Sequence, residues 1–459
     1  MTAAPYWPFI VLGLGILTVV ILIARLRIHA FLSLMISAVV VGVLSGQLPG
    51  DDATAHLLRA VELPMLEFGR IAGQIAFVIA LAAIIGTAMM ESGAAGKIVN
   101  SLINVFGEGK TAIALIASSL VLAIPVFFDT VFFLLIPLAA ALRLKTGNNY
   151  VLFVMAIAGG AAITHHLVPP TPGPLIMAEN MQVDLGLTIM AGLLAAIIPA
   201  ITVYYGGKYI NQKWDIPFRG SIATSGDSKS AKESDWTPGL FLSLLPVVLP
   251  VLLISLSTIF GLSEDGASLF FSFLGNKNVA MLLGTMIAMW LWAHKKGWRI
   301  GDLGDAVSEP LQIAGIIILI TCAGGAFGAM IKLAGIADAV AWATADFQIS
   351  FILLGWVTAA VMKIAQGSGT VAMITASSIM FAIIGDGSTL SYHPIYVLMA
   401  IGFGAMFISW MNDSGFWVVA KLGGFTEKET LRTWTVMLGL IGLVGLLQLL
   451  IAAAIFPMV

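Results

Sequence analysis

Two adjacent histidines and two separate carboxylates are the residues of this chain whose types and positions could bind an anion or carry a proton. His165 and His166 stand at the start of a proline-rich segment, and Asp129 and Asp413 each lie between long apolar segments. Ionisable side chains within a membrane are costly to bury and mark functional sites. The candidate proton-coupling residues are Asp129, His165, His166 and Asp413.

The proline-rich segment 164–174 must interrupt a helix. Residues 169–174 contain four prolines and one glycine, and a proline inside a helix removes a hydrogen bond and clashes with the preceding turn. Because both flanks are strongly apolar, the break falls at membrane depth, where freed backbone groups must line a cavity or be covered by protein. The predicted substrate-binding residues here are Thr164, His165, Thr171 and Gly173. A proline-rich surface loop between two helices is the alternative.

The glycine-containing segment 366–370 is predicted to form a second tip at the site. Its glycines allow a tight turn with exposed backbone N–H groups. The helix that follows then directs its positive dipole end toward the cavity, which favours an anion. The predicted substrate-binding residues here are Gln366, Gly367, Ser368, Gly369 and Thr370. A plain turn is the alternative, and Lys363 either adds positive charge near the anion or extends to the surface.

Asp129 and the pair Asn412 and Asp413 place polar groups at two further tips. Asp129 follows the apolar run 125–128, and apolar surroundings favour the neutral carboxyl group that a proton carrier needs. The alternative is that Asp129 caps a helix beginning at residue 131. Asn412 and Asp413 can exchange hydrogen bonds with hydroxyl groups, so both are predicted to bind substrate. Capping of a kinked helix by Asp413 is the alternative.

The composition places these residues in a polytopic membrane protein. Of 459 residues, 59% are hydrophobic and only 10% are charged, and the mean hydropathy is +1.02, whereas soluble domains average about 25% charged residues. The chain contains no metal-ligand spacing, phosphate-binding loop or dinucleotide fingerprint, so we expect no metal and no cofactor. The expected partners are the lipid bilayer, a small-molecule anion and H+, with no nucleic acid.

Ten apolar segments are predicted to span the bilayer, which takes about 20 residues. They are residues 7–24, 31–48, 71–90, 150–178, 187–210, 238–260, 279–293, 311–331, 394–419 and 433–457. Two pairs of shorter apolar segments are predicted to be re-entrant hairpins, namely 111–124 with 131–142 and 349–364 with 371–384. Two full spans per pair are the alternative.

The charges of the connecting segments agree with this topology. Basic connections such as Arg25 with Arg27, and 208–236, are predicted to be cytoplasmic, and the acidic connection 47–70 is predicted to be outside. Ten spans and two hairpins then place both termini outside.

An internal repeat appears when the chain is displaced by 242 residues along itself. Gly86 then meets Gly328, Gly160 meets Gly402, and both hairpins and both helix breaks fall in register. The sequence therefore predicts an all-α polytopic membrane protein of two inverted-topology repeats, each with five spans, one re-entrant hairpin and one broken helix. The predicted units are a first repeat at 1–210, a cytoplasmic linker at 211–237 and a second repeat at 238–459. Such repeats are typical of secondary transporters.

The tip motifs resemble those of the gluconate permease family, the gluconate:proton symporters of the wider ion transporter superfamily. The matching segments are 91–93, 125–129, 164–174, 365–370 and 412–417, and the resemblance extends over nearly the whole chain. It implies a symporter of the inner membrane, with periplasmic termini here, for gluconate or a related small sugar or hydroxy acid. The wider group implies a homodimer with an elevator-like moving domain. Thr171 and His166 depart from several gluconate transporters, which leaves other aldonates and D-serine as alternatives.

Three other functions make different demands on the sequence. A Na+-coupled carboxylate transporter would favour two oxygen-rich cation sites at the tips, whereas the first tip is apolar apart from Asp129. An intramembrane enzyme using His165 or His166 as a base would need a nucleophile or metal partner at a suitable spacing, and the sequence contains none. A passive channel would equilibrate its substrate without accumulating it.

Overall fold

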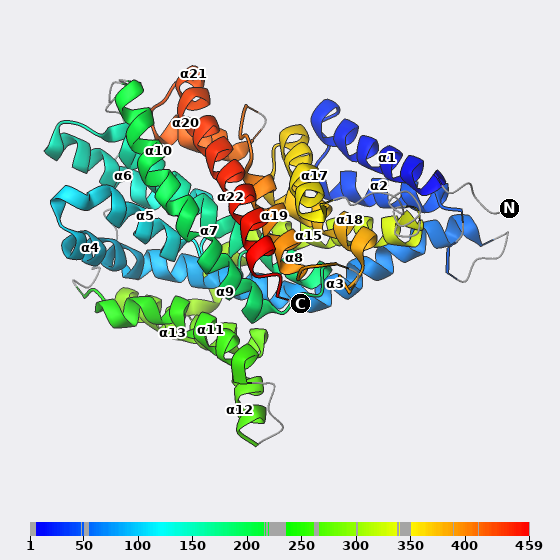
Figure 1. Ribbon diagram of the computed structural model, residues 1–459. Helices are drawn as coiled ribbons and strands as arrows, with labels where there is room; N and C mark the ends of the chain where they lie inside the picture. Colours follow the sequence, from blue (N-terminus) through cyan, green and yellow to red (C-terminus); the bar gives the residue numbers. More distant parts are fainter. Residues whose placement is uncertain are drawn as a thin grey trace.

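The computed structural model describes residues 6–46, 48, 49, 55–214, 216, 219, 236–260, 266–299, 302–336, 339, 350–388, 390–411 and 413–458. Every regular element in this part of the chain is a helix, so the predicted all-α fold is confirmed (Figure 1). In the first half the helices are α1 (Trp7–Val20), η1 (Ile21–Arg25), α2 (Ala30–Leu44), α3 (His56–Glu91), α4 (Ala94–Phe106), η2 (Glu108–Lys110), α5 (Thr111–Leu122), α6 (Phe128–Thr146), α7 (Tyr150–Leu167), α8 (Pro172–Asn180), α9 (Leu185–Ala195) and α10 (Ile197–Lys213). In the second half they are α11 (Leu240–Phe260), α12 (Gly266–Leu274), α13 (Lys277–Lys296), α14 (Asp302–Ala306), α15 (Ser308–Leu333), α17 (Phe351–Gln366), α18 (Gly369–Ile384), α19 (Ile395–Met406), α20 (Ser414–Leu422), α21 (Glu427–Thr430), η3 (Leu431–Thr435) and α22 (Val436–Ile455).

Six helical segments of the described chain are long and apolar enough to cross a membrane. They are His56–Glu91, Tyr150–Asn180, Leu185–Lys213, Leu240–Ile259, Asp302–Leu333 and Glu427–Ile455. Several predicted spans are instead shorter apolar helices. The predicted span 394–419, for example, is divided because α19 ends at Met406 and α20 begins at Ser414. The protein is a polytopic α-helical membrane protein, with fewer full-length spanning helices among its described residues than the ten predicted.

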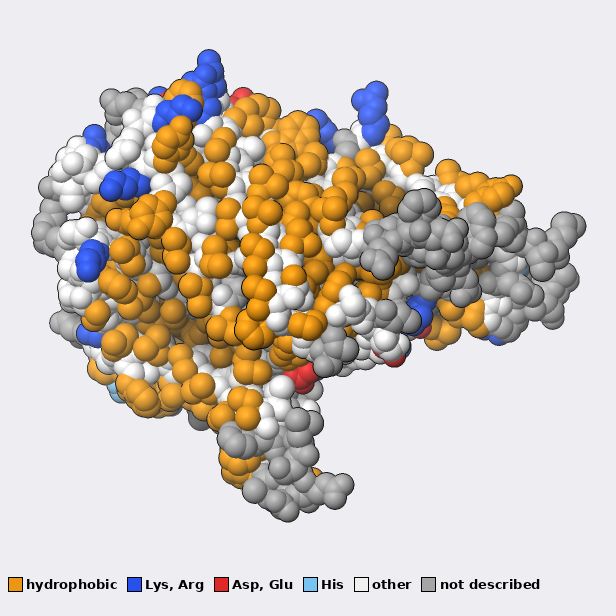
Figure 2. Space-filling model, in the orientation of Figure 1, with side chains coloured by type: hydrophobic (Ala, Val, Ile, Leu, Met, Phe, Trp, Pro, Cys, Tyr) orange, Lys and Arg blue, Asp and Glu red, His pale blue; other side chains and the backbone are white. Residues whose placement is uncertain are grey.

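Helices α7 and α19 form the centre of the molecule and pack against each other. Every residue of α19 is buried, and so is every residue of α7 except His165 and His166. The outer helices instead leave apolar side chains exposed, such as Leu252 of α11 and Leu447 of α22. These side chains contribute to a broad hydrophobic surface, visible in Figure 2. A helix that is apolar on all sides is stable only in the core or in lipid, and this chain uses both.

Helix α3 differs from its prediction by starting 15 residues early. The segment 47–70 was expected to be a connection outside the membrane, but α3 is continuous from His56 and contains Pro64. Its charged first turns are compatible with a helix because Arg59 pairs with Glu62, and Arg70 pairs with Glu67 at 2.7 Å. Pairs three residues apart lie on one helix face and favour the helical form.

The two predicted hairpins correspond to two pairs of helices. Helix α5 spans 12 residues and α6 spans 19, with a tip between them at 123–127. Helices α17 and α18 span 16 residues each and pack against each other, with a tip at Gly367 and Ser368. At Gly367 the backbone has φ of +76°, a conformation that glycine adopts without strain. Re-entry of each pair on one side of a membrane stays a prediction.

Both predicted helix breaks are present. Helix α7 ends at Leu167 and α8 begins at Pro172, because the prolines between them cannot continue the helix. The second break lies between α19 and α20, and residue 412 within it lies outside the described residues. This break contains no proline, and Ile408 adopts φ of +52°, which is strained for a β-branched residue.

The helix bounds repeat at the predicted displacement of 242 residues. The displacement carries α8 (Pro172–Asn180) onto 414–422, which are the bounds of α20. It also carries the apolar segment Leu185–Lys213 onto Glu427–Ile455. The packing repeats as well, because α7 contacts α5 and α10, and α19 contacts α17 and α22. The opposite orientation of the two halves in a membrane stays a prediction.

Contacts between helix ends join residues that the charge pattern predicts to lie on the same side. Lys277 pairs with Glu179 on the side predicted to be outside. Lys296 pairs with Glu91 at 3.2 Å, and Arg219 pairs with Glu429 at 2.6 Å, on the side predicted to be inside. In Figure 2, Lys and Arg side chains gather along the upper and left edges of the hydrophobic surface. Which side is the cytoplasm stays a prediction.

Candidate substrate site

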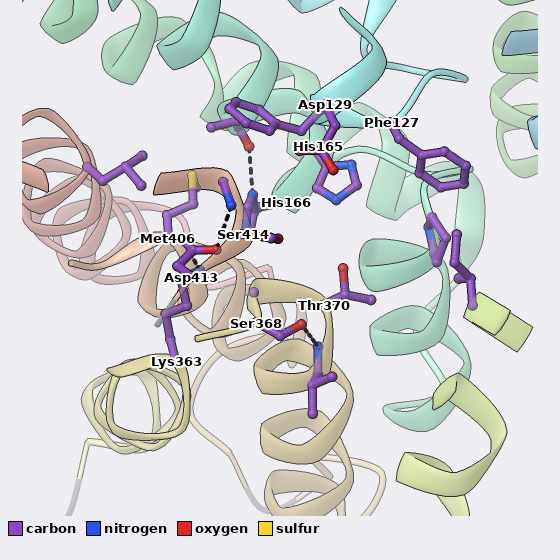
Figure 3. A pocket seen from close by; sticks show the side chains of 18 of the residues that line it. Phe127, Asp129, His165, His166, Lys363, Ser368, Thr370, Met406, Asp413 and Ser414 are labelled. Carbon is purple, nitrogen blue, oxygen red and sulfur yellow. Dashed lines mark hydrogen bonds and ion pairs between the residues drawn. The ribbon is translucent and has the colours of Figure 1, made fainter. Parts of the chain in front are cut away.

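Four helices begin at one cavity of about 460 Å³ (Figure 3). They are α6, α8, α18 and α20, and their first residues, Phe128, Pro172, Gly369 and Ser414, line the cavity. The first N–H groups of a helix have no partner within the helix, and that end carries partial positive charge. Four such ends around one space make the cavity favourable for an anion.

His165 and His166, in the last turn of α7, present nitrogen atoms that have no partner among the described residues. Nδ1 of His165 and Nε2 of His166 are buried and make no hydrogen bond. Nδ1 of His166 lies 2.8 Å from the carbonyl oxygen of Ala162, so in the neutral ring Nδ1 donates and Nε2 is an acceptor. Because a buried unpaired polar atom is costly, both nitrogens are suited to hydrogen bonds with substrate hydroxyl groups.

Lys363 of α17 and Asp413, at the start of α20, form a buried ion pair. The ammonium nitrogen lies 2.6 Å from Asp413 Oδ2, and the two side chains are 5% and 9% exposed. Asp413 Oδ2 also accepts a hydrogen bond from the Ser409 hydroxyl, and Oδ1 accepts one from the N–H of Gly415 at 3.0 Å. Lys363 therefore does not extend to the surface. Asp413 caps α20, which is compatible with a role at the cavity.

Asp129 lies in the first turn of α6, where its side chain lines the cavity and is exposed to it. It makes no hydrogen bond or ion pair with another described residue, although Lys363 and Asp413 line the same cavity. Helix α6 begins at Phe128 and its N-cap is Phe127, so the alternative interpretation of Asp129 as a cap is wrong. The carboxyl group is thus available to solvent, protons and substrate.

Three predicted residues of the second tip also line the cavity, namely Ser368, Gly369 and Thr370. The Ser368 hydroxyl caps α18 by accepting the N–H of Val371 at 3.3 Å. The Thr370 hydroxyl points into the open space, opposite the ring of His165 (Figure 3). At Gly369 an added Cβ atom would lie 2.3 Å from Nε2 of His166, so the approach of α18 to this histidine requires glycine.

Four other predicted residues do not line the cavity. Thr164 is buried within α7, and Gly173 packs against Met373. The Thr171 hydroxyl donates to the carbonyl oxygen of Val168 at 2.7 Å, which stabilises the helix break. Gly367 provides the turn before α18. The side chain of Gln366 and the whole of Asn412 lie outside the described residues.

The apolar wall of the cavity was not predicted from the sequence. It includes Ile313, Ile317 and Ile320 of α15, together with Met406, Trp434 and Leu438. The isoleucines recur at helical spacing, but apolar residues recur in this way on every spanning helix of the chain. Trp434 also donates its indole N–H to the Ser409 hydroxyl at 3.1 Å and stacks on Phe128, which links the wall to the Asp413 network.

Comparison with known proteins extends over nearly the full chain. The family described as GntP family permease matches residues 7–455. The chain belongs to the GntP permease family. The low-affinity gluconate transporter of Escherichia coli (strain K12) is 30% identical over 445 residues, which cover 95% of this chain and 96% of that protein. The Gnt-II system L-idonate transporter of the same strain is 29% identical over 455 residues, which cover 98% and 99%.

A solved structure has the same fold as this GntP family permease. It is the YdaH transporter of Alcanivorax borkumensis, described as having an unusual topology, with a TM-score of 0.65 and 15% identity over 96% of this chain and 99% of that one. Membership confirms the resemblance found in the tip motifs. The permease is a multi-pass membrane transporter and not an enzyme, as predicted.

Proposed function

We propose that this GntP family permease takes up gluconate, or a related small sugar or hydroxy acid, by symport with protons. The observation that carries the proposal is the convergence of four helix N-termini, Lys363 and two imidazole rings on one cavity. Such a set of groups suits a ligand with one negative charge and several hydroxyl groups. The relatives named for gluconate and L-idonate transport support an acid of this kind. D-serine and Na+-coupled carboxylate transport are the alternatives.

Alternating access is proposed to occur by an elevator-like motion in a homodimer of the inner membrane, with periplasmic termini. Helices α5–α8 and α17–α20 supply most of the cavity and contact one another, through α7 with α19 and α8 with α18. We propose that these helices move as one body against α3 and α15. The matching helix bounds at 242 residues support an inverted repeat as the basis of the two end states.

Proton coupling is proposed to use Asp129. Of the predicted carriers Asp129, His165, His166 and Asp413, it combines an ionisable side chain, exposure to the cavity and freedom from described partners. Both carboxylate oxygens of Asp413 already accept hydrogen bonds. A free carboxyl group at the cavity can bind and release a proton without breaking an ion pair.

Uptake into proteoliposomes tests the proposed symport. With the outside more acidic than the lumen, labelled gluconate should accumulate by about tenfold per pH unit for one proton, since a pH unit supplies about 1.4 kcal/mol. Protein-free liposomes are the control. Accumulation driven only by a sodium gradient would favour Na+ coupling, and equilibration without accumulation would indicate a channel.

The Thr370 hydroxyl is predicted to bind substrate. Replacing Thr370 by valine removes the hydroxyl and keeps the shape, so gluconate binding should weaken by about 1.5–3 kcal/mol if the hydroxyl contacts the carboxylate. Binding of labelled gluconate to the purified protein measures this. Thr375→Val is the matched control, because Thr375 lies on the same helix, is fully buried and does not line the cavity. Equal affinities of the two variants would remove Thr370 from the site.

A further inference from the structure

The ammonium group of Lys363 has one hydrogen-bond donor that no described residue uses. A lysine ammonium carries three N–H donors. One of them is directed to Asp413 Oδ2 at 2.6 Å and another to the carbonyl oxygen of Gly367 at 3.3 Å. Lys363 is only 4% exposed and lines the cavity. Because a buried charged donor without a partner is costly, this third N–H marks a place for an anionic group of a ligand.

Asp413 is arranged to hold this ammonium group in place. Its carboxylate is fixed by the Ser409 hydroxyl and by the N–H of Gly415, and Ser409 is itself held by Trp434. The pair also joins α17 to the start of α20, 50 residues later in the chain. Asp413 therefore compensates the charge of Lys363 in the cavity wall and determines where the remaining donor lies.

We propose that Lys363 binds the carboxylate of the substrate through this third N–H, with Asp413 as its positioning residue. The inference rests on the proposed uptake of a sugar acid and adds the polarity of the bound molecule. The carboxylate lies beside Lys363 and the start of α18, where the helix end adds further positive charge. The hydroxyl-bearing tail extends toward His165 and Phe127, on the other side of the open space in Figure 3.

The consequence is a preference for the anion over a neutral molecule of the same shape. Gluconamide carries the same hydroxyl groups as gluconate but no charge. Lys363 attracts a carboxylate through a charged hydrogen bond and gains much less from a neutral amide. The ratio of gluconate affinity to gluconamide affinity is therefore a measure of Lys363 that a purely structural ion pair would not change.

The test measures both ligands by equilibrium binding to purified protein, with no ion gradient. Lys363→Gln should weaken gluconate binding by about ten- to a hundredfold and leave gluconamide binding nearly unchanged. The double variant Lys363→Gln with Asp413→Asn keeps a neutral hydrogen-bonded pair and leaves no buried carboxylate unpaired. It should lose the same preference. Asp413→Asn alone and Lys363→Arg keep the positive charge and should retain a preference for gluconate.

Normal preference for gluconate in the double variant would overturn the inference, because the ion pair would then be structural only. Loss of the preference in Asp413→Asn, with retention in Lys363→Gln, would overturn it as well. If Lys363→Gln does not fold, the comparison of the double variant with Lys363→Arg decides. Failure of the natural protein to bind gluconate at all would instead contradict the proposed function, so the two failures are distinguishable.

Discussion

Replacing Asp129 by asparagine is expected to abolish accumulation of substrate against a gradient while leaving substrate binding in place. Asparagine keeps the size and hydrogen-bonding capacity of the side chain but cannot take up and release a proton. Under an imposed gradient of one pH unit, the internal concentration of gluconate should fall from about tenfold above the external one to equality. Time courses in proteoliposomes, combined with equilibrium binding to the same protein, measure both parts of the expectation.

Asp386→Asn is the matched control for this variant. Asp386 lies in the turn after α18, outside the cavity, and accepts a hydrogen bond from the backbone N–H of Ser388 at 3.0 Å. Its replacement removes one carboxylate from the chain and should leave accumulation unchanged. If Asp129→Asn concentrates gluconate as the natural protein does, another group carries the proton, and His165 becomes the next residue to replace.

The same proteoliposomes give the number of protons. A monoanion that crosses with one proton moves no net charge, so an imposed membrane potential should not change accumulation. With two protons one positive charge crosses, and each 100 mV adds about 2.3 kcal/mol. The cavity contains two carboxylates and one lysine, so both values are chemically feasible.

A disulfide between α15 and α18 is expected to stop transport completely and reversibly. The Cβ position at residue 324 of α15 lies 3.2 Å from Cβ of Ile374 in α18, within a few tenths of an ångström of the about 3.5–4.5 Å that a disulfide spans. Gly324→Cys with Ile374→Cys would then tie the proposed moving body to α15. Cys322, the one natural cysteine, is buried in α15 and is first replaced by alanine.

A second cysteine pair provides the control for this cross-link. The Cβ position at residue 160 of α7 lies 3.3 Å from Cβ of Ser119 in α5. Both helices belong to the proposed moving body, so this disulfide should leave transport active. Each variant is assayed oxidised and reduced, which separates the cross-link from any change in packing. Full activity of the oxidised 324–374 variant would indicate local gating in place of a moving body.

The helix breaks and the repeat were predictable from the sequence because they depend on local backbone chemistry. The prolines of 169–174 end α7 whatever surrounds them, and Gly367 allows the turn before α18. A displacement of 242 residues was visible in the positions of a few glycines, and the bounds of α8 and α20 agree with it. Two residues of the histidine pair and three of the second tip were therefore placed at the cavity without knowledge of the tertiary structure.

Only the tertiary structure decided which side chains meet. The pairing of Lys363 with Asp413, the isoleucine wall of α15 and the role of Thr171 in the helix break all depend on which helix faces pack together. In a soluble protein, the contrast between an apolar face and a polar face predicts that packing. Here nearly every helix is apolar on all sides, because its outer face contacts lipid and its inner face contacts other helices. The sequence therefore determines where helices begin and end, whereas the partners of their polar side chains follow from the three-dimensional packing.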